Sequence, residues 1–174
     1  MKKCVTVILA LVLVLSLVGC GFGAKILQYP PELTVVCGEE KTEAMTGTIS
    51  WRYRAGQQMR SITTSVPHPL TLKEQLTPLV LPGTSPEALM GSLEWEVMPD
   101  VVSACCWSGE IWGQPDAAGE DVPVETGTEA AKQYTIPLKD GEYIYQVDAQ
   151  WNSAEDYGGT VSFVFYTVGA QLAG

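Results

Sequence analysis

An alternation of apolar and polar side chains with a period of two recurs in short segments along this chain of 174 residues. The clearest case is Tyr143–Trp151, in which Tyr145, Val147 and Ala149 share a face with the two terminal aromatic residues. Successive side chains of a β-strand point to opposite faces of its sheet, so this pattern predicts strands with one buried face. No segment with a helical period is long enough to suggest an α/β fold.

Turns rich in Gly, Pro, Asn and Asp separate the alternating segments, which is typical of a β-sandwich or barrel. The residues 161–168 are apolar on both faces and predict a central strand. The predicted strands cover residues 33–37, 45–53, 59–66, 93–97, 101–107, 134–138, 143–151 and 161–168.

Two segments predict short helical turns, and one predicts a loop. Thr71 and Glu74 have the spacing of a capping box, and Pro86 follows Ser85 as proline does in the first turn of a helix. Residues 113–132 are rich in Gly, Pro, Ala and acids without any period, so we expect a long exposed loop there.

The N-terminus has the layout of an export signal. Lys2 and Lys3 precede an apolar run of about 14 residues, which is shorter than the roughly 20 residues of a membrane-spanning helix. The run ends at Leu17-Val18-Gly19-Cys20, which resembles the lipobox of bacterial lipoproteins. The resemblance implies cleavage between Gly19 and Cys20 and attachment of a diacylglycerol to the Cys20 thiol. A spanning anchor and an ordinary cleaved signal are the alternatives.

This interpretation divides the chain into a signal peptide that forms an N-terminal signal helix (1–19), a lipidated tether (20–29) and a β-sandwich domain (30–174). Each buried methylene contributes about 0.8 kcal/mol, and two acyl chains hold a protein stably on a bilayer. We therefore expect a lipid-anchored domain on the extracytoplasmic face of the cell membrane.

The charge of the exported part argues against nucleic acid as a partner. The chain has 10 basic and 20 acidic residues. Loss of Lys2 and Lys3 with the signal leaves a net charge of −12. A surface of this sign repels the phosphates of nucleic acid and the headgroups of anionic lipids.

Three cysteines remain in the domain besides Cys20. An exported domain tolerates disulfides, so Cys37 is a candidate partner for Cys105 or Cys106. Such a bridge would close a loop of about 70 residues and stabilise the fold by roughly 4 kcal/mol on a chain-entropy model. Three reduced, buried thiols are the alternative. The spacing of cysteine and histidine predicts no metal site, and no cofactor motif is present.

The segment Leu138–Tyr145 resembles the entry to the penultimate strand of immunoglobulin-like sandwiches. The resemblance implies an all-β, immunoglobulin-like antiparallel β-sandwich of about 7–9 strands. It also implies a tyrosine corner, in which the hydroxyl of Tyr143 bonds to nearby backbone. Tyr145 stands where antibody domains place a cysteine, so their usual inter-sheet disulfide is not expected.

A wider set of short motifs is similar to a group of small Firmicutes lipoproteins with no established activity. The motifs are Pro30-Pro31-x-Leu33-x-Val35, Gly47-Thr48-x-Ser50-Trp51, Pro99-x-x-Val102, Tyr143-x-Tyr145-x-Val147-x-Ala149-x-Trp151 and Gly158-Gly159. The resemblance therefore carries no catalytic residue to this chain.

Two sets of residues are candidates for catalysis, and both have a simpler interpretation. His68 is the single histidine and lies between two prolines, without a nucleophile motif nearby. Glu94 and Glu96 share one face of a strand, as paired carboxylates of glycosidases do, and equally form the solvent side of an amphipathic strand.

Tryptophan supplies the candidates for binding. Trp51, Trp95 and Trp151 alternate with polar residues and are expected in the core. Trp107 and Trp112 flank a turn beside the acidic segment 113–132, so they are possible binding residues.

The sequence favours a non-catalytic binding or interaction module that is tethered to the membrane and contacts an envelope protein or a cell-wall ligand. A carboxylate-dependent hydrolase of an envelope polymer is one alternative. A regulatory or sensory partner of an envelope membrane protein is the other.

Overall fold

The computed structural model describes residues 26–83, 89–127, 133–152 and 156–169. The signal peptide with its expected helix, Cys20, most of the tether and the helical turn expected at Pro86 lie outside the described residues. Within the part that is described, no helix is long and apolar enough to cross a membrane.

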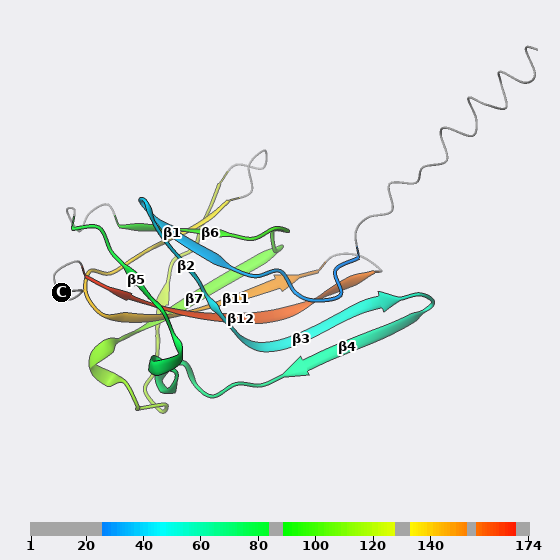
Figure 1. Cartoon of the computed structure of the whole chain (residues 1–174), viewed down its shortest axis with the longest axis horizontal. Coiled ribbons are helices and arrows are strands. Elements are labelled where there is room, and N and C mark those ends of the chain that lie inside the picture. The colour runs from blue at the N-terminus through cyan, green and yellow to red at the C-terminus, as the bar shows by residue number, and fades with distance from the viewer. Residues whose placement is uncertain (1–25, 84–88, 128–132, 153–155, 170–174) are drawn as a thin grey trace, which may run out of the picture.

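Two sheets packed face to face form the domain, as expected of an all-β sandwich (Figure 1). The first sheet has the order β2-β1-β6-β10-β9. Its strands are β1 (Thr34–Cys37), β2 (Glu40–Glu43), β6 (Met90–Glu94), β9 (Glu125–Thr126) and β10 (Tyr134–Pro137).

The second sheet has the order β4-β3-β12-β11-β7-β8, and a short strand, β5, runs parallel to the end of β12. Its strands are β3 (Met45–Ala55), β4 (Gln58–Thr64), β5 (Pro78–Val80), β7 (Val101–Ser108), β8 (Glu120–Val122), β11 (Tyr143–Trp151) and β12 (Tyr157–Val168). Three short 3₁₀ turns complete the described elements: η1 (Pro69–Thr71), η2 (Lys73–Gln75) and η4 (Gly109–Ile111).

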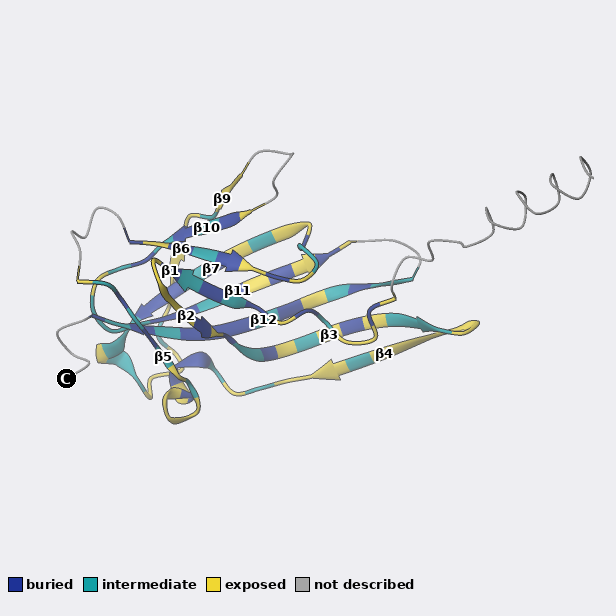
Figure 2. Cartoon of the chain, turned by 45° about the horizontal axis from the view of Figure 1, so that its top comes forward, coloured by how far each residue is buried: buried dark blue, intermediate teal, exposed yellow. Residues whose placement is uncertain are grey.

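The main core lies between the sheets, and the alternation along β11 shows how it is built. Tyr145, Val147 and Ala149 are almost fully buried, whereas Asp148 and Gln150 between and beyond them are exposed. Figure 2 shows the same alternation of buried and exposed residues along the neighbouring strands. The sequence pattern therefore assigned the faces of this strand correctly.

The central position predicted for residues 161–168 is confirmed, because β12 pairs with both β3 and β11. Phe163 and Phe165 enter the main core. Val164 points to the other face, where η1 and the adjoining Leu72 cover it with a second apolar cluster. That cluster contains Leu70, Leu72, Trp107, Ile144 and Val164.

The described residues hold twelve strands, more than the 7–9 expected. The surplus consists of short edge strands, of which β8 and β9 fall in the segment 113–132 that was expected to be a loop. An edge strand pairs its backbone with one neighbour only, so it needs no apolar face and leaves no period in the sequence. The chain leaves β7 through the short turn η4, which follows Ser108 directly.

The three tryptophans expected in the core are buried there. Trp51 and Trp151 meet edge to face with 5.5 Å between ring centroids, and Trp95 contacts Trp151 at 6.3 Å. Trp51 Nε1 donates to the carbonyl of Leu27 at 3.1 Å, and Trp151 Nε1 donates to that of Val97 at 3.0 Å. Trp95 Nε1 is buried without a hydrogen-bond partner among the described residues.

In the described part of the chain, Trp51 has a hydrogen-bond partner for its indole N–H and Trp95 does not. Replacing each by phenylalanine should therefore lower the free energy of unfolding by different amounts. Trp51→Phe leaves the buried carbonyl of Leu27 without its donor, a loss of about 1–3 kcal/mol on top of the reduced ring packing. Trp95→Phe loses ring packing but removes an unsatisfied donor. Urea denaturation should therefore give a free energy of unfolding at least about 1 kcal/mol lower for Trp51→Phe. Equal losses would contradict the assignment of these hydrogen bonds.

Candidate functional site

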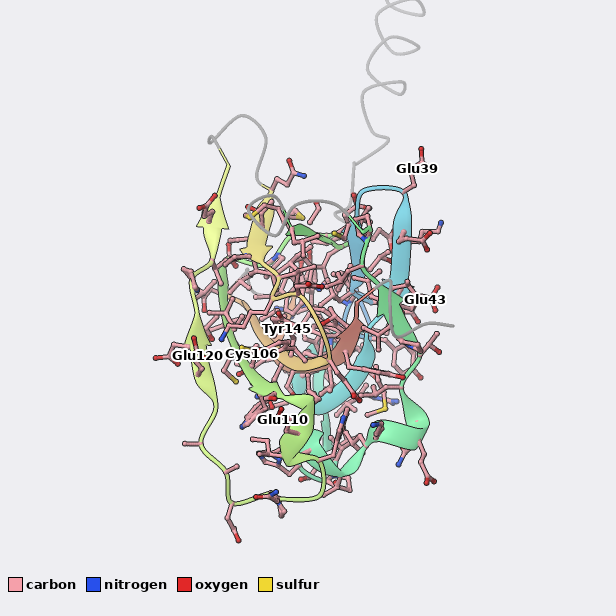
Figure 3. The ribbon with its side chains drawn as sticks, turned by 90° about the vertical axis from the view of Figure 1, so that its left-hand side faces the viewer. Glu39, Glu43, Cys106, Glu110, Glu120 and Tyr145 are labelled. Carbon is pink, nitrogen blue, oxygen red and sulfur yellow. The ribbon has the colours of Figure 1, made fainter. Side chains whose placement is uncertain are left out.

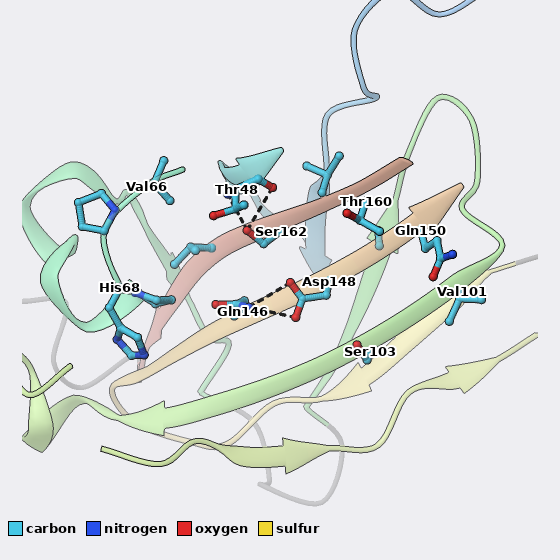
Figure 4. A pocket seen from close by; sticks show the side chains of 15 residues that line it. Thr48, Val66, His68, Val101, Ser103, Gln146, Asp148, Gln150, Thr160 and Ser162 are labelled. Atoms are coloured by element: carbon cyan, nitrogen blue, oxygen red, sulfur yellow. Dashed lines mark hydrogen bonds between the residues drawn. The ribbon is translucent and has the colours of Figure 1, made fainter. Parts of the chain in front are cut away.

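A groove of about 650 Å³ lies on the outer face of the second sheet (Figure 4). Strands β3, β12, β11 and β7 form its floor. Residues 66–69, which lead from β4 into the start of η1, close one end. The side chains labelled in Figure 4 come from all of these elements.

The strand register places polar side chains of three strands side by side on the groove floor. Asp148 of β11 is paired with Ser103 of β7 on one side and with Ser162 of β12 on the other. Gln150 likewise lies between Val101 and Thr160. Because cross-strand partners share a face, these residues form rows across the sheet.

Two hydrogen-bonded pairs hold these groups in place. Gln146 Nε2 lies 3.0 Å from each carboxylate oxygen of Asp148. Ser162 Oγ accepts the backbone N–H of Thr48 at 2.7 Å, where the pairing of β3 and β12 is irregular. A Cβ atom at Gly47 would lie 2.6 Å from this oxygen, so only glycine lets the serine fill the gap. The groove floor is therefore organised before any ligand binds.

His68 lines the closed end of the groove. Its Nδ1 accepts the backbone N–H of Leu70 at 3.3 Å, so the neutral ring carries its proton on Nε2. The ring also meets Trp107 edge to face at 5.2 Å. These contacts give His68 a structural role in η1 and leave Nε2–H as a hydrogen-bond donor.

The two candidate carboxylates lie elsewhere. Glu94 ends β6 in the first sheet, and both Glu94 and Glu96 are exposed on either side of the buried Trp95. They line a second hollow of about 610 Å³ together with Tyr29 and Glu32 near the N-terminal end of the domain. The structure thus keeps the two glutamates on one surface but does not bring them together with His68.

Both tryptophans that were considered for binding make internal contacts. Trp107 is 7% exposed, and its Nε1 donates to the carbonyl of Ala117 at 3.0 Å. Trp112 is half-buried, and its Nε1 donates to Glu142 Oε1 at 2.8 Å. Lys73 lies over the Trp112 ring and also pairs with Glu142 at 2.7 Å.

The contacts of Lys73 and Trp112 also change the pKa of Glu142. The hydrogen bond from Lys73 lowers the pKa of Glu142, and the bond from Trp112 acts in the same direction. Trp107 contacts His68 at the start of η1, and Trp112, at the end of η4, contacts Lys73 of η2. Contact of Trp112 with a ligand stays a prediction.

The tyrosine corner was assigned to the wrong tyrosine. The hydroxyl of Tyr145, rather than that of Tyr143, accepts the backbone N–H of Lys139 at 2.7 Å. Tyr143 lies nearer the turn, half-buried, with the Lys139 ammonium 5.3 Å from its ring centre. The two tyrosines share a face, but only Tyr145 is deep enough to be fully buried, and burial raises the pKa of its hydroxyl.

The expected disulfide is absent, because Cys37, Cys105 and Cys106 are all free thiols. The alternative of three buried thiols holds for Cys37 and Cys106, whereas Cys105 is half-buried. Cys105 and Cys106 are neighbours on β7 and point to opposite faces, and only Cys106 joins Cys37 in the main core. Figure 3 shows Cys106 on one side of the sandwich and Glu39 and Glu43, from the region of β1 and β2, on the other.

The environment of the thiols keeps them protonated. Burial raises the pKa of Cys37 and Cys106. Burial, helped by the charge of Asp148, raises the pKa of Cys105 to about 11. At neutral pH the thiolate, which is the reactive form, is therefore scarce at all three sites.

Comparisons with protein-family models, with curated proteins and with solved structures found no match for this chain. Within the described ranges, no three His, Cys, Asp or Glu side chains cluster closely enough to hold a metal ion. The function of this protein is therefore inferred from the geometry of the molecule.

Sequence reasoning missed the groove, although a signal for it was present. Gln146, Asp148 and Gln150 are the polar members of the same alternation that marks the core face of β11. What the pattern did not contain was the register that sets Ser103 and Ser162 beside them.

The corrected tyrosine corner gives a matched pair of variants. Tyr145→Phe should lower the free energy of unfolding by about 0.5–1.5 kcal/mol, because it removes a buried hydrogen bond to the backbone. Tyr143→Phe keeps the ring under Lys139 and should change the unfolding free energy by less than about 0.5 kcal/mol. Chemical denaturation of both variants measures the difference, and a larger loss for Tyr143→Phe would reverse the assignment.

Proposed function

We propose that this protein is a lipid-anchored, extracytoplasmic binding module without catalytic activity, and that its ligand is a neutral strand of a cell-wall polymer. The observation that supports this proposal is the groove on the second sheet. Its polar lining consists of hydroxyl and amide groups, one imidazole and one carboxylate. A binding groove of this kind orients a ligand through a few fixed polar groups.

The charge of the lining selects a neutral ligand. Among the described residues, no lysine or arginine lines the groove, so an anionic polymer would find no counter-charge from them there. The single carboxylate, Asp148, already accepts two hydrogen bonds from Gln146. Hydroxyl and amide groups that repeat at the strand spacing of about 4.8 Å suit a polymer that offers donors and acceptors along its length.

Catalysis by the glutamates has weaker support. Glu94 is the last residue of β6 in the first sheet and Glu96 lies just beyond it, and neither lines the groove. Both side chains are exposed to solvent, whereas the general acid of a glycosidase typically lies against an apolar pocket. A hydrolase therefore remains the second candidate and is tested by the same binding experiments.

Anchoring is tested at Cys20. Cys20→Ala removes the thiol that would accept the diacylglycerol, so metabolic labelling with a fatty acid should disappear and lipoprotein-type processing should stop. Mass spectrometry of the N-terminal peptide measures the lipid on the unaltered protein. Membranes that contain the unaltered protein without this lipid would refute the anchoring.

Ligand binding is tested in the groove. The double variant Gln146→Ala/Gln150→Ala removes two amide groups from its floor and should weaken binding of the protein to purified cell-wall sacculi by about tenfold, at about 0.5–1.5 kcal/mol per hydrogen bond. The matched control is Gln75→Ala/Gln114→Ala, which changes two exposed glutamines outside the groove.

Co-sedimentation with sacculi measures the binding. Equal binding by both double variants would move the site away from the groove. Release of wall fragments that stops in Glu94→Gln would instead identify a hydrolase.

A further inference from the structure

The basic residues of the domain are unevenly placed. All three arginines of the chain, Arg52, Arg54 and Arg60, lie on β3 and β4. The segment between Glu43 and Glu74 contains no acidic residue, although the rest of the exported chain is strongly acidic. The hairpin formed by β3 and β4 is therefore a local exception to the negative charge of the molecule.

This hairpin projects from one end of the sandwich (Figure 1). Its strands pair from Ile49↔Thr64 to Ala55↔Gln58, and β12 accompanies β3 only as far as Tyr53. The tip turns at Gly56, where φ is +66°. Met59, next to the tip, has 47% of its surface exposed.

The three arginines differ in their surroundings. Arg54 Nε lies 2.7 Å from Asp156 Oδ1, so its charge is already compensated. Arg52 and Arg60 are exposed, one on each face of the hairpin. Met59 pairs with Arg54 and therefore shares the face of Arg52, while Arg60 lies on the opposite face. Arg52, Met59 and Arg60 are together called here the hairpin tip surface.

The hairpin lies at the end of the domain from which the N-terminal segment leaves. Trp51, which precedes Arg52, donates its indole N–H to the carbonyl of Leu27. Ala55 is four residues beyond Trp51 in the sequence, so the hairpin extends about 13 Å beyond this contact. Ile26 is six residues beyond Cys20, and a chain of this length spans at most about 20 Å.

A lipid on Cys20 would therefore hold the hairpin tip surface within reach of the headgroups. We propose that Arg52, Met59 and Arg60 contact anionic phospholipids of the membrane to which the protein is anchored. This inference rests on the proposed anchoring at Cys20.

The acids at the same end determine which surface faces the bilayer. Glu32, Glu94 and Glu96 line the hollow beside the N-terminal segment, and anionic headgroups repel them. The domain consequently tilts toward the hairpin and away from this hollow. The contact fixes the orientation of a domain that a lipid alone would leave free to rotate.

The experiment places a fluorescent probe on the tip of the lipidated protein. Gln57→Cys offers an exposed thiol, whereas burial raises the pKa of the three native thiols and slows their labelling. The labelled protein is reconstituted into vesicles that carry a headgroup quencher. We expect stronger quenching in phosphatidylglycerol vesicles than in phosphatidylcholine vesicles, and a loss of this difference in 0.5 M salt, where the Debye length is only about 4 Å.

Arg52→Gln/Arg60→Gln should abolish the difference between the two lipids, since each basic residue near an anionic surface contributes about a fivefold change in affinity. The matched control is Lys41→Gln, which removes a charge from β2 and should leave the quenching unchanged. Equal quenching in both lipids, or an arginine variant that behaves like the control, would overturn the proposal.

Mass spectrometry of the N-terminal peptide distinguishes failure of the lipid anchoring at Cys20 from failure of the hairpin contact. If the protein is lipidated but its tip probe is quenched equally in both kinds of vesicle, only the hairpin contact is refuted. An unlipidated protein refutes the anchoring and, with it, the premise of the contact.

Discussion

The pairing of β11 with β12 is the interaction on which the rest of the structure depends. Its nine residue pairs set Tyr145 against Phe165 in the core, with stacked rings 5.0 Å apart. The same register sets Asp148 beside Ser162 on the outer face. A slip of one residue in this register would turn the core residues of the strand to the outer face and the groove residues inward. The same register therefore determines both the core and the groove.

The edge strands of the two sheets differ in charge, and β4 of the basic hairpin is one of them. Strands β2, β8 and β9 are short and bear glutamate or aspartate, which discourages pairing with another chain. Strand β4 is longer, carries no acid and has Arg60 as its charged residue. Contact of the hairpin tip with a membrane surface would cover part of the edge that β4 exposes.

Elements that bury a face were predictable, and elements that rely on backbone pairing alone were not. The bounds of β11 and the central place of β12 follow from their side chains. The short strand β8 has no such signal, because its backbone pairs with β7 whatever its side chains are. The groove depends on partners from strands far apart in the sequence, so no local pattern reveals it.

The sequence by itself determined the all-β class, the inward faces of the long strands and the uneven charge, because periodicity and composition are local properties. The tertiary structure decided which tyrosine reaches the backbone of Lys139 and whether Cys37 meets another thiol. It also decided that Gln146, Asp148 and Ser162 share a surface. Depth in the core and strand register are set by all the packed elements at once, and one segment of sequence does not contain them.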